Sequence, residues 1–237
     1  MNKLPHVRQI IETASQSGAW NMAVDQILLQ SAFESGIATL RWYSWEPTVS
    51  LGYFQSEAEL QTDKRLVNLP HVRRLSGGGT LVHDHELTYS LSLPPSQSLI
   101  TRPVELYHIA HQCIAAELSR RGANAMLRGV TVKNRQEPVL CFAREDEHDL
   151  VLDGHKILGS AQRRRRGAIL QHGGLLLAAS SVTPELLGLQ DLRPGIDLDK
   201  LAESLGNAIL VEVAEKWERG ALTTEELDRV RSMIAGF

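Results

Sequence analysis

The chain has 237 residues, of which 43% are hydrophobic and 22% are charged, and its 25 basic and 28 acidic side chains give a formal net charge of −3 at pH 7. This composition is ordinary for a globular protein, and the length is sufficient for a large core. Because there is no excess of positive charge, nothing in the overall electrostatics favours a nucleic-acid partner. Any basic binding site has to be local.

The sequence contains no stretch approaching the roughly 20 apolar residues of a membrane span, and its first residues lack the pattern of a signal peptide. We therefore expect a cytoplasmic protein with no membrane partner. The two cysteines, Cys113 and Cys141, are expected to be free thiols, because one pair in a chain of this size without an export signal is a weak indication of a disulfide.

The first third of the chain alternates between strand and helix patterns. Residues 6–13 predict a strand, and the helix that follows has Asn21 as its expected N-cap and ends at Gly36. Two aromatic, β-rich segments, 38–45 and 48–54, predict two strands around a turn at Pro47.

Ser56 and Glu59 have capping-box spacing, which predicts a short helix over residues 57–66. Residues 72–75 and 80–82 are expected to be strands on either side of a glycine-rich segment. Residues 85–93 alternate with a period of two, which places four apolar side chains on one face of a strand: Leu87, Tyr89, Leu91 and Leu93.

A second helix is expected to start at Thr101 and Pro103 and to stop at Gly122, with Cys113 packed inside it. Asp153 and Gly154 predict a two-residue hairpin turn between strands at 149–152 and 156–161. A second turn at 163–167 is expected to lead into a strand at 168–172.

From about residue 183 the patterns become helical. A short helix is expected from Thr183, a long amphipathic one over residues 197–216, and a last helix opened by the capping box of Thr223 and Glu226. Because no repeat or linker interrupts the chain, we expect residues 1–237 to form a single α+β domain with a mixed, largely antiparallel sheet flanked by helices.

The most distinctive segment runs from Arg73 to Asp84 and contains three consecutive glycines between a basic pair and a short apolar run. Such a backbone approaches a ligand closely because no Cβ atoms stand in the way. A flexible turn is the simpler interpretation, and the neighbouring charged residues favour a binding loop. The candidate binding residues here are Arg73, Arg74, Ser76, Gly77, Gly78, Gly79, Thr80 and His83.

Two further residues are candidates for catalysis. Cys141 lies in an irregular segment, where a thiolate can act as a nucleophile, although a buried hydrophobic role is the commoner one for a free cysteine. Lys156 follows a hairpin and precedes Gly159, Ser160 and Ala161, so that its ammonium could bind a carbonyl oxygen or a phosphate, although most such lysines are solvated. His172 and Gly173 lie further along. No cysteine and histidine spacing resembles a zinc site.

Arg163 to Arg166 form the one strong run of charge. At a hairpin tip such a run is commonly solvated. The alternative is a docking patch for an acidic partner protein, because arginine binds carboxylate and phosphate groups bidentately.

Taken together, these segments resemble the family of lipoate-protein ligase A and octanoyltransferases, which is related in fold to the biotin protein ligases and the class II synthetases. The resemblance lies in Asn21 to Asp25, in RRLSGGGTLVHD from Arg73, and in GHKILGSAQRRRRGAILQHG from Gly154. Cys141 lies upstream of the lysine hairpin, as in octanoyltransferases of the LipM type, which use a cysteine nucleophile.

The resemblance implies that Cys141 takes an octanoyl group from octanoyl-acyl carrier protein and passes it to a lysine of a lipoyl domain, either the glycine cleavage H protein or a dehydrogenase E2 subunit. It implies that Lys156 stabilises the oxyanion and that the glycine-rich loop, His83, residues 159–161, His172 and Gly173 bind the substrate. No metal, nucleotide or other cofactor is expected.

Three alternatives remain open from the sequence. An ATP-dependent lipoate ligase would need ATP and magnesium and would not need Cys141. An amidotransferase between lipoyl domains would share the cysteine mechanism. A catalytically silent lipoyl-domain binder would keep the fold alone.

Overall fold

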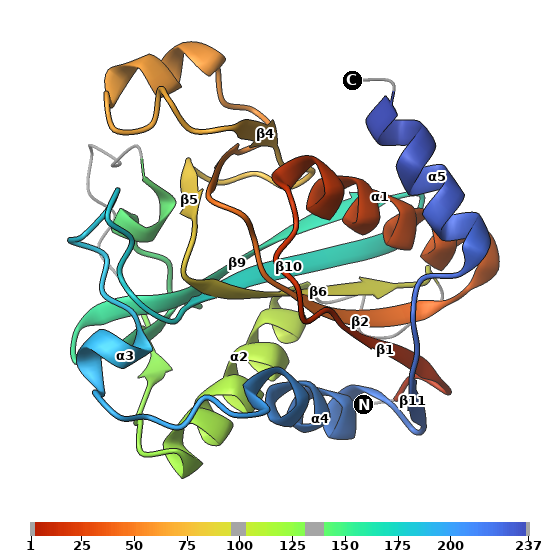
Figure 1. Cartoon of the computed structure of the whole chain (residues 1–237). Helices are drawn as coiled ribbons and strands as arrows, with labels where there is room; N and C mark the ends of the chain where they lie inside the picture. Colours follow the sequence, from red (N-terminus) through yellow and green to blue (C-terminus); the bar gives the residue numbers. More distant parts are fainter. Residues whose placement is uncertain (1–2, 96–102, 131–139, 236–237) are drawn as a thin grey trace.

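The computed structural model describes residues 3–95, 103–130 and 140–235 and is built on an eight-stranded sheet (Figure 1). Its strands are β1 (Val7–Ile11), β2 (Ala38–Tyr43), β6 (Glu86–Leu93), β7 (Met126–Leu127), β8 (Leu150–Leu152), β9 (His155–Arg165), β10 (Ala168–Leu176) and β11 (Trp217–Arg219). They lie in the order β11-β1-β2-β6-β10-β9-β8-β7. The pairs β11–β1 and β1–β2 are parallel and the other neighbours antiparallel, which confirms the predicted α+β fold with a mixed, largely antiparallel sheet.

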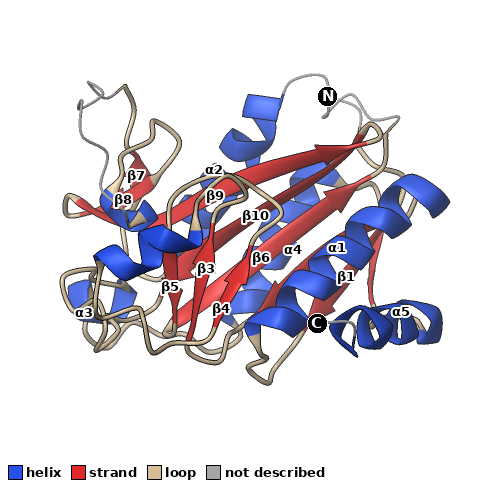
Figure 2. Ribbon diagram, turned by 90° about the horizontal axis from the view of Figure 1, so that it is seen from above, coloured by secondary structure: helices blue, strands red, loops and turns tan. Residues whose placement is uncertain are grey.

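Helices cover both faces of this sheet. The helices α2 (Pro103–Arg120) and α4 (Leu201–Val213) lie on one face, and α1 (Gly18–Ser35) and α5 (Thr224–Ala235) lie on the other (Figure 1). A second sheet of three strands, β3 (Thr48–Leu51), β4 (His71–Arg73) and β5 (Leu81–His83), lies beside α1, as Figure 2 shows from above. Among the described residues, none of the helices has the length and apolar character needed to cross a membrane.

The central strand β6 is buried on both faces. Leu87, Tyr89, Leu91 and Leu93 share one face, as predicted, and belong to the main hydrophobic core together with side chains of α2 and α4. The other face carries Glu86, Thr88, Ser90 and Ser92, which are also buried. Because buried polar groups need partners inside the protein, this second face marks a polar layer within the fold.

Local capping signals set several helix boundaries. The prediction of Asn21 as N-cap was wrong: the side chain of Ser17 accepts a hydrogen bond from the main chain of Trp20, so that α1 begins at Gly18. The capping box of Ser56 and Glu59 is present, but it opens a 3₁₀ helix, η1 (Glu57–Thr62), rather than an α-helix.

The last quarter of the chain departs further from the sequence patterns. Residues from Thr183 to Leu186 form a hydrogen-bonded turn, and the short helix α3 (Leu189–Leu192) begins later than predicted. Strand β11 was not predicted, because three residues carry no periodic signal and their pairing with β1 joins distant parts of the chain. The expected helix start at Thr101 lies outside the described residues.

The C-terminal helix is attached to the sheet through a buried ion pair. Arg8 of β1 donates from Nη1 and Nη2 to the two carboxylate oxygens of Glu226, both at 2.8 Å, and Ser31 of α1 donates to the same carboxylate. Glu226 also completes the predicted capping box with Thr223. Burial raises the pKa of Glu226, but the hydrogen bonds and charge of Arg8 lower it more, so that the carboxylate is charged in the fold.

We expect Glu226→Gln to lower the free energy of unfolding by about 3 kcal/mol, because removing one partner of a buried pair leaves the Arg8 charge uncompensated. Urea denaturation measures this change. The matched control is Arg229→Gln on the same helix, whose pair with Glu34 is partly exposed and should cost less than about 1 kcal/mol. Equal losses in the two variants would contradict the assignment of Glu226 as the anchor.

Candidate active site

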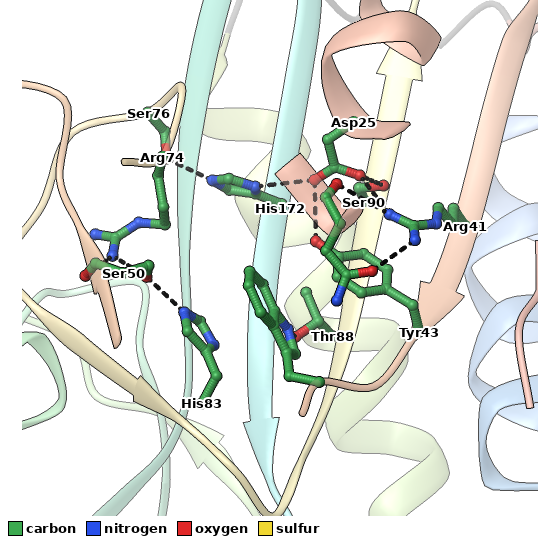
Figure 3. A network of polar contacts seen from close by, with 12 residues as sticks. Asp25, Arg41, Tyr43, Ser50, Arg74, Ser76, His83, Thr88, Ser90 and His172 are labelled. Atoms are coloured by element: carbon green, nitrogen blue, oxygen red, sulfur yellow. Dashed lines mark hydrogen bonds and ion pairs between the residues drawn. The ribbon is translucent and has the colours of Figure 1, made fainter. Parts of the chain in front are cut away.

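The glycine-rich loop that links β4 to β5 is held in shape by Arg74. This side chain is 4% exposed. Its Nη1 donates to the carbonyl oxygen of Ser50 at 2.8 Å and to the hydroxyl of Ser50 at 2.6 Å, and its Nη2 donates to the carbonyl oxygens of Gly79 at 2.7 Å and Gly77 at 3.3 Å (Figure 3). One guanidinium therefore fastens both ends of the triple glycine to strand β3.

The loop also lies very close to the turn that follows β3. A Cβ on Gly52 would lie 2.0 Å from the carbonyl oxygen of Gly78, and Gly78 has a φ of +100°, so that both positions require glycine. The main chain of Tyr53 donates to the carbonyl of Ser76. Arg73 points to this turn and donates to the carbonyl oxygens of Gly52 and Gln55.

A buried hydrogen-bonded chain connects the loop to helix α1. The hydroxyl of Ser76 is bonded to Nε2 of His172, and Nδ1 of His172 lies 3.2 Å from a carboxylate oxygen of Asp25 (Figure 3). Arg41 and Ser90 also donate to Asp25. Burial raises the pKa of Asp25, but the hydrogen bond from His172 and the charge of Arg41 lower it more, and the net pKa lies below its ordinary value.

A second chain of the same kind lies on the other side of Arg74. The hydroxyl of Ser50 is 2.5 Å from Nε2 of His83, and Nδ1 of His83 is 2.8 Å from Glu86. Because the imidazole of His83 stacks on Trp45 with ring centroids 3.8 Å apart, its plane is fixed. These contacts make His83 an orienting residue for the loop.

Cys141 lies across from the loop, at the start of the short 3₁₀ helix η3 (Cys141–Ala143). Its main-chain N–H donates to the carbonyl of Thr80 at 2.7 Å, and Leu140 forms a parallel bridge with Thr80. The side chain of Cys141 is partly exposed. Cys113, in contrast, packs against the main core within α2, as predicted, and burial raises its pKa to about 11.

Lys156 at the start of β9 is bound to the same segment. Its Nζ forms a 2.9 Å ion pair with Asp149 and donates to the carbonyl oxygens of Cys141 at 3.3 Å and Arg144 at 3.2 Å. Burial raises the pKa of Asp149, and the charge of Lys156 opposes that increase. Lys156 is thus a buried, ion-paired residue that fixes the main chain beside the thiol.

These parts enclose a cavity of about 660 Å³. Its walls come from the glycine-rich loop, from the segment after η3, and from the facing strands β9 and β10, where Gly159, Gly173 and Gly174 leave the sheet surface without side chains. Apolar and aromatic groups contribute to the lining, among them Tyr43, Trp45, Leu81, Tyr107 and Phe142.

Most of the residues singled out in the sequence meet in this cavity. Those that line it are Arg74, Gly77, Gly78, His83, Cys141, Lys156, Gly159, Ser160, Ala161, His172 and Gly173. The remaining four, Arg73, Ser76, Gly79 and Thr80, do not line the cavity, although each lies in the glycine-rich loop or directly before it. The four arginines are not a hairpin tip, since β9 continues to Arg165 and only Arg166 and Gly167 make the turn.

Several polar residues of the site were not predicted. Asp25, Arg41 and Glu86 are buried, and Asp149 neutralises Lys156. The available signal was a charged residue within a predicted helix or strand, as at Asp25 and Glu86. In the part of the chain that the structure describes, no group of three or more histidine, cysteine, aspartate or glutamate side chains is arranged to hold a metal ion.

Comparison with known proteins shows which family this chain resembles. Residues 17–187 match the family model of the lipoyl protein ligase A/B catalytic domain. The octanoyltransferase LipM of Clostridioides difficile is 29% identical over 255 residues, covering 95% of this chain and 94% of that protein. The octanoyltransferase LipM of Anoxybacillus flavithermus is 37% identical, covering 72% of this chain and 66% of that protein.

Solved structures show the same fold. A lipoate-protein ligase A bound with ATP superimposes with a TM-score of 0.78 at 20% identity, covering 97% of this chain and 94% of that one. A bipartite lipoate protein ligase from Thermoplasma acidophilum, studied with its E2 lipoyl domain, gives a TM-score of 0.71 at 17% identity over 98% and 93% of the two chains. From the sequence match, the chain belongs to the lipoyl protein ligase A/B catalytic-domain family.

Proposed function

We propose that this protein is an octanoyltransferase that acts in protein lipoylation through an acyl-enzyme on Cys141. The observation that carries the proposal is the position of the Cys141 thiol, which is partly exposed and lines the cavity between the glycine-rich loop and Lys156. The relatives named octanoyltransferase LipM, which align along most of this chain, support the same activity.

The reaction has two steps. The Cys141 thiolate attacks the carbonyl carbon of an octanoyl thioester on acyl carrier protein; the new C–S bond forms, the C–S bond to the carrier breaks, and the carrier leaves as a thiolate that takes a proton from solvent. The uncharged amine of a lipoyl-domain lysine then attacks the acyl-enzyme. A C–N bond forms, the bond to Cys141 breaks, and the proton lost by the amine restores the thiol.

Each step passes through a tetrahedral oxyanion, which needs preorganised donors. Lys156 holds the carbonyl of Cys141 and so orients the thiol. Because the three donors of its ammonium are taken up by Asp149 and by the carbonyl oxygens of Cys141 and Arg144, we assign main-chain N–H groups of the glycine-rich loop to the oxyanion in place of the Lys156 ammonium that the sequence suggested. The aromatic and apolar lining of the cavity suits an eight-carbon acyl chain. The proposed reaction uses neither a nucleotide nor a metal.

The proposed partners are acyl carrier protein as donor and a lipoyl domain, of the glycine cleavage H protein or a dehydrogenase E2 subunit, as acceptor. Strand β9 runs from the cavity at Gln162 directly into the arginine run at residues 163–166, and Arg163 stacks over the ring of Tyr53 at 4.5 Å. We assign this run to the docking of an acidic partner.

We expect Cys141→Ala to abolish acyl-enzyme formation. Intact-protein mass after incubation with octanoyl-acyl carrier protein in the absence of ATP should show an octanoyl adduct on the wild-type protein, and a lipoyl domain should discharge it. Cys113→Ala is the matched control, since this thiol lies in the core and should leave the adduct unchanged.

An octanoyl adduct that persists on Cys141→Ala would contradict the proposal. Modification of the lipoyl domain only with free acid, ATP and magnesium would instead identify a ligase, and tight lipoyl-domain binding without turnover would identify a silent binder. Loading from an octanoylated lipoyl domain but not from acyl carrier protein would identify an amidotransferase.

We expect the double variant Arg165→Gln and Arg166→Gln to load more slowly from acyl carrier protein at low salt and to show a weaker salt dependence, because exposed charges act mainly on the association rate. Both side chains are exposed. The loading rate at several ionic strengths measures the effect.

The control for this variant is Arg120→Gln with Lys216→Gln, which removes the same charge from the last residue of α2 and from the residue before β11, both exposed. Equal salt dependence of the two double variants would argue against a docking role for the arginine run.

A further inference from the structure

The charge of Arg74 is unusual among the buried arginines. Three arginines of the described residues are buried: Arg8, Arg41 and Arg74. Arg8 is paired with Glu226, and Arg41 with Asp25 and Glu12. Arg74 donates only to hydroxyl and carbonyl oxygens, and within the described residues no carboxylate lies at ion-pair distance from it.

An unpaired buried charge is costly, and burial accordingly lowers the pKa of Arg74. The interaction with the charge of Cys141 is the largest of those that oppose this effect and raise the pKa of Arg74. The carboxylate of Glu86 opposes it as well, but from beyond ion-pair distance. The protein therefore keeps a positive charge with no direct carboxylate partner, beside a group that becomes negative when it loses a proton.

The geometry brings the two groups together across Gly78. A Cβ on this glycine would lie 3.3 Å from Nη2 of Arg74 and 3.6 Å from Sγ of Cys141. The guanidinium nitrogen and the sulfur are therefore no farther apart than these two distances together. A side chain at this position would contact both groups.

Lys156 is placed differently. Its ammonium is ion-paired with Asp149 at 2.9 Å, and the side chains of both residues are buried. As a pair the two residues carry no net charge. Of the two cations, Lys156 and Arg74, Arg74 is the one that has no carboxylate at ion-pair distance within the described residues.

We propose that the guanidinium of Arg74 is the charge partner of the Cys141 thiolate. The inference deepens the proposed cysteine mechanism and rests on it. The thiol proton goes to solvent, and Arg74 stays protonated throughout. During acyl transfer, the negative charge moves from the sulfur to the oxyanion and then to the leaving thiolate, and Arg74 acts on it by charge through the gap at Gly78.

Other ionisable groups also line the cavity, and the test has to separate their effects from that of Arg74. They come from β2, β5 and β6, from α2, from the segment after η3, and from β9 and β10: Tyr43, His83, Glu86, Tyr107, Arg144, Glu145, Asp146, Asp149, Lys156 and His172.

The experiment is the rate of alkylation of Cys141 by iodoacetamide between pH 5 and pH 10, followed by peptide mass. Cys113 serves as an internal reference, because burial raises its pKa to about 11 and it reacts slowly below that pH. In Arg74→Gln we expect the rate at pH 7 to fall by roughly tenfold and the midpoint of the pH profile to rise by about one unit. At pH 10 the two rates should converge.

Two further variants sharpen the test. Arg73→Gln is the matched control: its side chain is more exposed, lies 3.9 Å from Glu57 and binds the turn after β3, so that the pH profile should not move. Arg74→Lys keeps the charge with fewer hydrogen bonds and should recover part of the rate at pH 7.

The proposal is overturned if folded Arg74→Gln has the wild-type pH profile, or if its rate falls equally at every pH, which would indicate altered access. If Arg74→Gln does not fold, the double variant Asp149→Asn with Lys156→Gln still decides, because it removes a neutral pair. An unchanged midpoint supports Arg74 as the charge partner, and a midpoint raised by a unit assigns the charge to Lys156 instead.

This measurement uses no acyl donor, and its result is independent of whether transfer occurs. A protein that shows the expected alkylation profiles but forms no octanoyl adduct would retain the charge pair and lose the proposed transferase activity. An octanoyl adduct together with an unchanged alkylation profile in Arg74→Gln would retain the transferase activity and contradict the charge pair.

Discussion

The arrangement of the whole site depends on one buried carboxylate, that of Asp25 in helix α1. It is fully buried and accepts hydrogen bonds from Arg41 and Tyr43 of β2, from Ser90 of β6 and from His172 of β10. A buried carboxylate is tolerated only when its lone pairs are satisfied, so that α1 and three strands are held in one relative position. Burial and the nearby charge of Asp25 raise the pKa of Tyr43 well above its ordinary value.

The conformation of the glycine-rich loop depends in part on the Asp25 carboxylate. His172, oriented by Asp25, binds Ser76 at the start of the loop, and His83, oriented by Glu86, binds Ser50, which accepts from Arg74. Each chain runs from a carboxylate through an imidazole to a serine hydroxyl, the order of groups found in hydrolytic triads. Here Ser50 and Ser76 are 0% and 1% exposed. The chains therefore serve to fix the backbone, and the thiol that we propose as the nucleophile lies on a different segment.

The parts of the fold that followed from the sequence are those governed by local interactions. The capping boxes at Ser56 and Thr223 involve atoms three residues apart, and the Asp153 and Gly154 turn joins neighbouring strands. Strand β11 and the Ser17 cap were missed because the first depends on pairing with β1 and the second lies outside the apolar pattern of α1. For Cys141, local sequence favoured a buried role. Its position facing the glycine-rich loop depends on a contact that is distant in the sequence, the hydrogen bond from its main chain to Thr80.

We assign different roles to the two cations beside Cys141, Lys156 and Arg74, because their surroundings differ. Lys156 is neutralised by Asp149 and uses its remaining donors on the carbonyl oxygens of Cys141 and Arg144, so that it fixes position. Arg74 has its donors on neutral oxygens, and within the described residues no carboxylate lies at ion-pair distance from its charge. A cavity wall that holds a nucleophile needs both properties, since a thiolate without a fixed main chain would be misdirected and a fixed thiol without a nearby cation would be a poor nucleophile. Gly78 contributes to the second property, because a side chain at this position would contact both the guanidinium and the sulfur.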